Sequence, residues 1–269
     1  MKKKIELDIQ NSEQNQQQCP KCGCEQDAEN TECVRCGVIF EKFWPISGRL
    51  RRGSQVSSEN AGKSFSGKNI RNLLFHVNPD QNMLYGIGHG IVLTVLILWG
   101  LRLIAAPIQS NYAGNSFLHL INLPFHEAGH VFFRPFGRLI TSMGGSLGQL
   151  LVPLTCCLVL LIKTRDPFGG AVTFWWFGEN FLDLAPYIND ARNLVLPLVG
   201  GNTGRSAPYG FHDWQFILTE TGLLKYDHIL ARAAWLIGSF IMFTAVFWAT
   251  FLLIRQYRIL AQERSTRKR

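Results

Sequence analysis

The stretch FLHLINLPFHEAGHVFF (residues 117–133) places His126, Glu127 and His130 in an otherwise apolar run. Residues four apart share one face of a helix, so both imidazoles can bind one zinc ion. Glu127 follows the first histidine directly and can reach a water molecule on that metal. Ionisable side chains in an apolar segment are costly in a bilayer and indicate a functional site. We therefore predict a catalytic zinc with His126 and His130 as ligands and Glu127 as the catalytic base.

The composition predicts an integral membrane protein. Hydrophobic residues make up 47% of the 269 residues and charged residues 17%, while the first 18 residues are rich in Lys and Gln. The net charge of +8 comes from basic residues near the N-terminus and at the extreme C-terminus, which favours membrane flanks over a nucleic-acid-binding surface. Because residues 1–18 lack the apolar core of a secretory signal, we expect the N-terminus in the cytoplasm and the chain in a plasma membrane, the inner membrane of a bacterium.

Five of the seven cysteines fall within residues 19–36. Two Cys-x-x-Cys-Gly motifs, Cys19 to Cys22 and Cys33 to Cys36, are separated by ten residues. This spacing predicts a zinc ribbon over residues 19–44, with these four thiolates holding a structural zinc. A redox dithiol pair is the less favoured alternative, since two pairs occur at matched spacing. We expect the ribbon to contact a protein partner, with nucleic acid the weaker possibility.

The remaining chain predicts an all-α multi-pass membrane helix bundle with four to five spans. Hydrophobic segments cover about residues 85–106, 116–133, 145–162, 170–188 and 231–254. If all five crossed, the basic C-terminus would lie outside, contrary to the positive-inside tendency. One segment is therefore expected to be re-entrant, with the second and fourth as candidates because they carry polar residues. The predicted domains are a disordered tail (1–18), the zinc ribbon (19–44), a basic flexible linker (45–82), the membrane domain (83–254) and a basic tail (255–269).

A catalytic zinc usually has three protein ligands, so one more is needed. The fourth segment offers Asp183 and Asp190 at helical spacing around Pro186. Both aspartates are candidate ligands. For His212 and Asp213, in a polar connection, we expect a solvated or structural role rather than metal binding.

These motifs resemble the site-2 protease family of intramembrane zinc metalloproteases. That family has His-Glu-x-x-His on one helix, a Gly-rich start to the next, and Asn-x-x-Pro-x-x-x-x-Asp-Gly on the third. Here the elements are residues 126–130, Gly144-Gly145-Ser146-Leu147-Gly148-Gln149, and Asp183-x-x-Pro186-x-x-x-Asp190-Ala191. The resemblance implies Asp190 as the third zinc ligand and Asp183 as a substrate-binding residue. Asp replaces Asn, the Pro-to-Asp spacing is one residue short, and Ala191 replaces Gly, so Asp183 remains the alternative ligand.

Two functions follow as expectations. The first is an intramembrane zinc metalloprotease that cleaves membrane proteins or membrane-associated peptides through a zinc-activated water. It would contain one catalytic and one structural Zn²⁺. The second is a non-catalytic membrane adaptor with a structural metal site, which acts through its zinc ribbon. A metal transporter has less support, because few other polar residues lie in the apolar segments.

Overall fold

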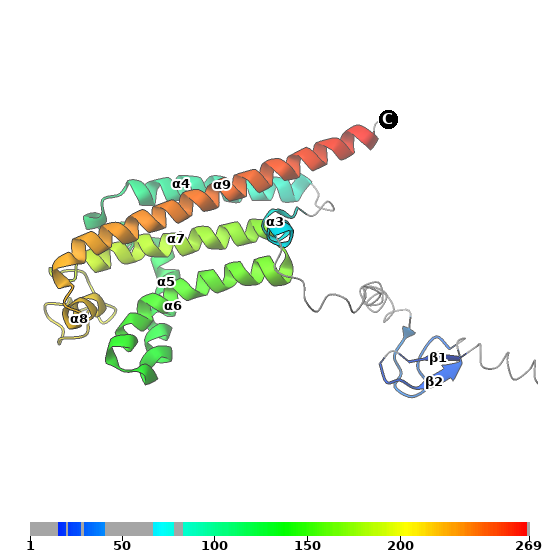
Figure 1. Ribbon diagram of the computed structural model, residues 1–269, viewed down its shortest axis with the longest axis horizontal. Coiled ribbons are helices and arrows are strands. Elements are labelled where there is room, and N and C mark those ends of the chain that lie inside the picture. Colours follow the sequence, from blue (N-terminus) through cyan, green and yellow to red (C-terminus); the bar gives the residue numbers. More distant parts are fainter. Residues whose placement is uncertain (1–15, 20, 28–29, 41–66, 78–82, 268–269) are drawn as a thin grey trace, which may run out of the picture. The chain divides into compact units, whose positions relative to one another are not determined.

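The computed structural model describes residues 16–19, 21–27, 30–40, 67–77 and 83–267 (Figure 1). The chain divides into two compact units, Met1–Phe65 and Ser66–Arg269. Residues 1–15 of the tail predicted for residues 1–18, the end of the predicted ribbon and most of the predicted linker lie outside the described residues.

The N-terminal unit is built on a short hairpin. Strands β1 (Gln16–Gln18) and β2 (Glu25–Asp27) pair antiparallel, with Gln17 opposite Gln26. The end of the predicted disordered tail is therefore a strand. Gly23 and Gly37 adopt positive φ, 71° and 66°, and each donates its amide to the carbonyl of the first cysteine of its motif at 2.9 Å. Only glycine takes this left-handed turn without strain, as the two Cys-x-x-Cys-Gly motifs require.

The second unit is helical. Its α-helices are α3 (Gly67–Phe75), α4 (Met83–Ala105), α5 (Phe117–Phe133), α6 (Arg138–Val159), α7 (Pro167–Asn189), α8 (Asp213–Glu220) and α9 (Asp227–Arg267). Short turns of 3-10 or π helix follow or precede them at Ile108–Ser110, Arg134–Phe136, Leu160–Thr164 and Leu224–Tyr226. Three helical stretches are long and apolar enough to cross a membrane: Met83–Ala105, Arg138–Thr164 and Leu224–Gln262. The all-α fold of this unit is confirmed, with three candidate membrane spans among the described residues where the sequence predicted four to five.

Helix α7 is the centre of the bundle, with α6 and α9 packed beside it (Figure 1). One part of the core joins Leu103 of α4, Trp175 and Leu182 of α7, and Met242 of α9. Most of α7 is buried, including Glu179 and Asp183. These two carboxylates therefore face the interior of the protein and not its surface.

Two boundaries differ from the sequence prediction. Residues 67–75, within the predicted flexible linker, form α3, whose last residue Phe75 packs edge-on against Phe251 at a ring distance of 5.3 Å. The predicted basic tail after residue 254 continues α9 to Arg267. In both places the polar composition suggested a loop, but a charged or amphipathic segment also forms a helix where one face packs.

Glycines bring α5 and α6 into close contact. A Cβ on Gly129 would lie 2.8 Å from the carbonyl carbon of Gly144, and one on Gly148 would lie 2.9 Å from the Cα of Gly129. Small residues at facing positions let helix backbones approach closely in membranes. The Gly-rich start of α6 thus sets the distance between α6 and the helix that carries His126 and His130.

Candidate metal centre

The four cysteines of the N-terminal motifs converge. Their sulfur atoms lie within 4.8 Å of one another, so Cys19, Cys22, Cys33 and Cys36 can hold one metal ion. Burial opposes ionisation of the Cys33 thiol, but hydrogen bonds from the backbone amides of Cys36 and Arg35 outweigh it and lower its pKa to about 6. A thiolate at neutral pH is the form that binds zinc. The predicted four-cysteine cluster is confirmed as a possible metal site.

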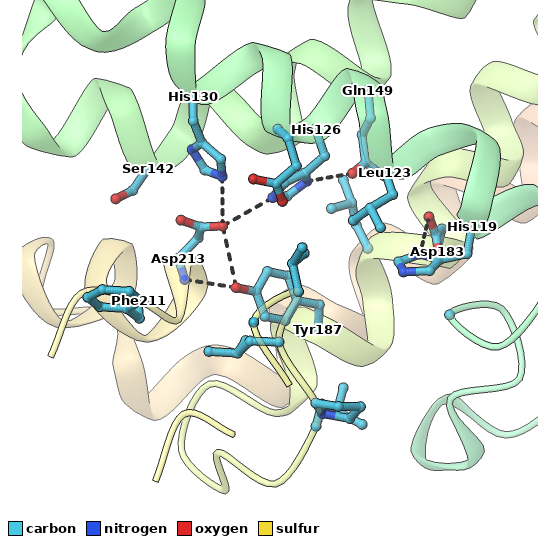
Figure 2. A pocket seen from close by; sticks show the side chains of 18 of the residues that line it. His119, Leu123, His126, His130, Ser142, Gln149, Asp183, Tyr187, Phe211 and Asp213 are labelled. Atoms are coloured by element: carbon cyan, nitrogen blue, oxygen red, sulfur yellow. Dashed lines mark hydrogen bonds and ion pairs between the residues drawn. The ribbon is translucent and has the colours of Figure 1, made fainter. Parts of the chain in front are cut away.

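The second group lies in the helical unit and joins two elements, α5 and the start of α8 (Figure 2). One ligand atom from each of His126, His130 and Asp213 lies within 4.8 Å of the others. The Nε2 atoms of His126 and His130 are 3.1 Å and 3.2 Å from Oδ2 of Asp213. Two ligands bound at about 2.0–2.1 Å to a tetrahedral zinc are separated by about 3.3 Å, so the spacing of this group fits one zinc ion.

The outer nitrogens of both rings are fixed by acceptors. His130 Nδ1 donates to the backbone carbonyl of Thr141 at 2.8 Å, and His126 Nδ1 lies 2.7 Å from Oε1 of Gln149. A neutral ring with its proton on Nδ1 turns the lone pair of Nε2 inward. Such acceptors on metal-ligating histidines are the usual second layer of a zinc site.

Asp213 is an anion facing these rings. Burial opposes its charge, but hydrogen bonding with His126 and His130 outweighs it and holds the pKa of Asp213 below its usual range. Tyr187 contacts Asp213 twice, accepting its backbone amide at 2.9 Å and reaching its Oδ2 at 3.3 Å. The two Nε2 atoms and the carboxylate of Asp213 converge on one point, so the group can bind a divalent metal, whereas without a metal a proton on an imidazole makes the same contacts.

The structure places Asp213, rather than Asp190 or Asp183, beside the two histidines. Asp190 ends α7, and its carboxylate accepts the backbone amides of Val195 and Leu196 at 3.1 Å and 2.9 Å. These bonds shape the chain that leads to Asp213. The sequence prediction of Asp190 as a ligand is therefore replaced by a role in organising this loop.

Asp183 also lies outside the group. Its Oδ1 is 2.9 Å from His119 Nδ1, and its Oδ2 accepts from Asn122 at 3.0 Å. Asn122 donates to Glu179 as well, at 3.0 Å, so α5 is fastened to α7 by buried polar contacts. Asp183 does line the same cavity as the histidines, where it holds the ring of His119.

His212 directly precedes Asp213 and holds the start of the helix to which Asp213 belongs. Its Nδ1 accepts the amide of Gln215 at 3.1 Å and thereby caps α8, which begins at Asp213. Burial lowers the pKa of His212 against the charges of Asp190 and Asp213, so the ring is neutral. The expected structural role of His212 is consistent with this geometry, whereas Asp213 was missed as a ligand candidate. The feature of the sequence that could have indicated Asp213 as a ligand is the pair His212-Asp213, which lies at the start of a helix within a polar connection.

A cavity of about 680 Å³ opens beside the three residues. Glu127 lines it, together with apolar side chains that include Leu123, Leu198 and Phe211. This size is within the range of ligand-binding clefts, and the mixture of apolar walls with a few polar groups is typical of them. The cavity therefore brings the Glu127 carboxylate and a possible metal site together.

Comparison with known protein families, with characterised proteins and with solved structures finds no match to this chain.

Proposed function

We propose that this chain is a membrane-embedded zinc metalloprotease that hydrolyses peptide bonds of membrane-associated substrates, and that it is a divergent relative of the site-2 proteases. The observation that carries the proposal is the group of His126, His130 and Asp213 beside Glu127 in one cavity. Two imidazoles and a carboxylate are a ligand set of catalytic zinc sites, which leave a fourth position for water or substrate. The three apolar helices support a location in the membrane.

In this proposal the proton transfers of the reaction are assigned to Glu127 and the activation of water to the metal site. A zinc ion at this site supplies Lewis-acid activation of water and of the scissile carbonyl. Glu127 accepts the proton of the attacking water as its oxygen bonds to the carbonyl carbon. Glu127 then delivers that proton to the nitrogen as the carbon–nitrogen bond breaks, which balances the hydrolysis.

The other polar residues position these groups. The Tyr187 hydroxyl donates to the carboxylate of Asp213, and Gln149 fixes the ring of His126. His119, whose side chain is 35% exposed, is the cavity-facing member of its pair with Asp183, whose side chain is 2% exposed. We assign His119, oriented by Asp183, to contact with the substrate backbone. The substrate-binding role predicted for Asp183 therefore becomes an indirect one in this proposal.

Zinc content tests the site first. We expect the purified full-length chain to bind two zinc ions, and Asp213→Ala and Cys33→Ser to bind one each. Glu127→Gln keeps every ligand and is expected to bind two. Glu220→Gln, a carboxylate change at the other end of α8, is the matched control and should also bind two.

Proteolysis tests the function. Membrane proteomes of cells with the wild type and with Glu127→Gln should differ in a set of fragments that only the wild type generates. Equal fragment patterns, with two zinc ions still bound in both proteins, would leave a metal-containing adaptor as the better description. A single zinc in the wild type, lost only on Cys33→Ser, would refute the intramembrane zinc itself. The separate four-cysteine unit is the observation that favours the adaptor.

A further inference from the structure

The geometry points to a carboxylate-binding subsite at the first turns of α6, where Arg138 and Ser142 bind a carboxylate of the peptide substrate beside the metal centre. The carboxylate comes from an acidic side chain or from the C-terminus of the peptide. The word substrate rests on the proposed function, whereas the binding of a carboxylate beside the metal centre does not require proteolysis.

Four residues of α6 form one row that faces the cavity and the two histidines. Gln149 bonds to the ring of His126, and a Cβ on Gly145 would meet both imidazoles. Ser142 and Arg138 precede Gly145 by three and seven residues, so they continue the same face toward the start of the helix. Both of them line the cavity, as Gln149 does. The row therefore leads from the metal centre to the guanidinium of Arg138.

The guanidinium of Arg138 is held by the segment that carries Asp213. Its Nη2 donates to the backbone carbonyl of Tyr209 at 3.1 Å, and its Cζ lies 4.6 Å from the centre of the Phe216 ring. Gly210, at a φ of 95°, leaves room for the guanidinium, since a Cβ there would collide with Nη2. These contacts fix the plane of the group but use few of its five N–H donors. The other donors are available to a ligand.

Arg138 is exposed and takes part in none of the ion pairs formed within the described part of the chain. It is also the only Lys or Arg among the described residues that line the cavity, whose acidic residues are Glu127, Asp183 and Asp213. Asp183 pairs with His119, and Asp213 faces the two histidines. The positive charge of Arg138 is therefore left for a ligand of the cavity.

Ser142 provides a second donor for the same ligand. Figure 2 shows its side chain pointing from α6 into the cavity, which it lines. Only 7% of Ser142 is exposed, and its hydroxyl forms no hydrogen bond with the residues that the structure describes. A hydroxyl buried to this extent is costly without a partner. Since Ser142 lies one turn of α6 after Arg138, one carboxylate can accept from both side chains.

The helix geometry indicates where the carboxylate lies in the peptide. Arg138 precedes Gly145 by about 10 Å along the axis of α6, and Phe216 follows Asp213 by about 5 Å along α8. An extended peptide advances about 3.3 Å per residue. When a peptide bond lies at the metal centre, the residue two or three positions away therefore lies beside Arg138. The planar guanidinium matches a carboxylate in shape and charge, so an acidic residue is favoured there.

Hydroxamates that carry a carboxylate test the subsite without any substrate. A hydroxamate binds an open position of zinc, and the monohydroxamates of succinic, glutaric and adipic acid hold a carboxylate at increasing distances from it. The binding of each compound and of its primary amide is measured by calorimetry on the zinc-loaded, detergent-solubilised full-length chain. We expect the best of the three acids to bind the wild type at least about tenfold more tightly than its amide, as hydrogen bonds to a charged group allow.

Substitutions assign this preference to residues. Arg138→Gln should bind acid and amide about equally, and Arg138→Lys, which keeps the charge without the planar fork, should show an intermediate preference. Ser142→Ala removes one donor and should reduce the preference about threefold. Arg134→Gln removes an exposed arginine four residues earlier that does not line the cavity, so it is the matched control and should keep the preference. Asp213→Ala gives the background without the metal centre.

The outcomes are distinct. Equal binding of acid and amide by the wild type at all three lengths would overturn the inference, whether or not the variants fold. A preference that persists in Arg138→Gln, or that is lost equally in Arg134→Gln, would also overturn it. If no hydroxamate binds above the Asp213→Ala background, the metal centre has no open position, and the inference falls together with the proposed function.

Cleavage of a peptide library from membrane proteins separates the two sources of the carboxylate. Bonds that the wild type cuts and Glu127→Gln does not should have Asp or Glu within about three residues, or should lie within about three residues of the peptide's C-terminus. The first result identifies an acidic side chain and the second a terminal carboxylate. Cut bonds with neither feature would overturn the subsite and leave the protease. The expected preference among the hydroxamates without any cut bond would retain the subsite and overturn the protease.

Discussion

Gly145→Ala perturbs the proposed zinc site without removing a ligand. Gly145 lies on α6 opposite both imidazoles, and an added Cβ would approach His130 Nε2 and His126 Cδ2 to 2.6 Å. Real Cβ atoms essentially never come closer than 3.0 Å, so each ring must retreat by at least about 0.4 Å, the difference between these two distances. Ligand distances in metal sites hold to within about 0.2 Å. The added methyl group therefore displaces the rings by more than a zinc site tolerates.

We expect the zinc content of Gly145→Ala to fall from two to one per chain. The loss of affinity at the membrane site should exceed about 100-fold, which is the upper end for changes that act on a ligand only through its neighbour. The clashing atoms are ring atoms and not backbone, so the helix bundle should keep its fold. Zinc content after equilibration with a chelator measures the first effect, and circular dichroism of the detergent-solubilised protein measures the second.

Two other glycines serve as references for this experiment. A Cβ on Gly88 of α4 meets nothing within 4 Å, so Gly88→Ala should bind two zinc ions. A Cβ on Gly148 would meet the backbone of α5, so Gly148→Ala should damage the α5–α6 contact and the fold together. A folded Gly145→Ala protein that holds two zinc ions as tightly as the wild type would refute the assignment of these rings as zinc ligands.

Three further changes test the groups around the site. Gln149→Leu removes the acceptor beside Nδ1 of His126 and should weaken zinc binding about 10- to 100-fold in a competition assay with a chelator, whereas Gln149→Glu, which keeps an acceptor, should not. Asp190→Ala leaves two backbone amides of the loop before α8 without their acceptor. It should lower the affinity for zinc, although Asp190 lies outside the group of ligands. An unchanged affinity would count against the role of Asp190 in holding this loop. Asn122→Leu removes the amide that donates to the buried carboxylates of Glu179 and Asp183. The free energy of unfolding should fall by at least about 2 kcal/mol and the apparent Tm by about 5 °C. Asn202→Ala, on the exposed loop, should leave the Tm unchanged.

The sequence predicted those features that depend on short spacings. The Cys-x-x-Cys-Gly motifs fix a local turn, and the structure has that turn with Gly23 at positive φ. Likewise, His126 and His130 share a helix face, and their rings lie 4.9 Å apart. Local geometry determines both arrangements, so a single sequence is sufficient to predict them.

The third ligand depends on tertiary structure instead. His126 and Asp213 are 87 residues apart, and no periodicity connects them. The sequence predicts Asp183 and Asp190 as ligands because they are carboxylates in an apolar segment like the one that carries the two histidines. The metal centre lies instead at one end of the bundle, where a polar connection reaches it. Helix α3 and the extension of α9 were missed for a related reason, since their composition is polar and their helical structure depends on packing.

The three aspartates show that the site is held partly by helix packing and partly by a connection between helices. Asp183 binds α5 to α7 inside the bundle, so the two histidines are held by helix packing. Asp213 comes from the connection after α7, and Asp190 holds that connection through Val195 and Leu196. The position of Asp213 therefore depends on the hydrogen bonds that hold this connection, in addition to the helix packing that holds the two histidines. A carboxylate on α7 would not depend on these bonds, but it would lie away from the connection whose residues line the cavity.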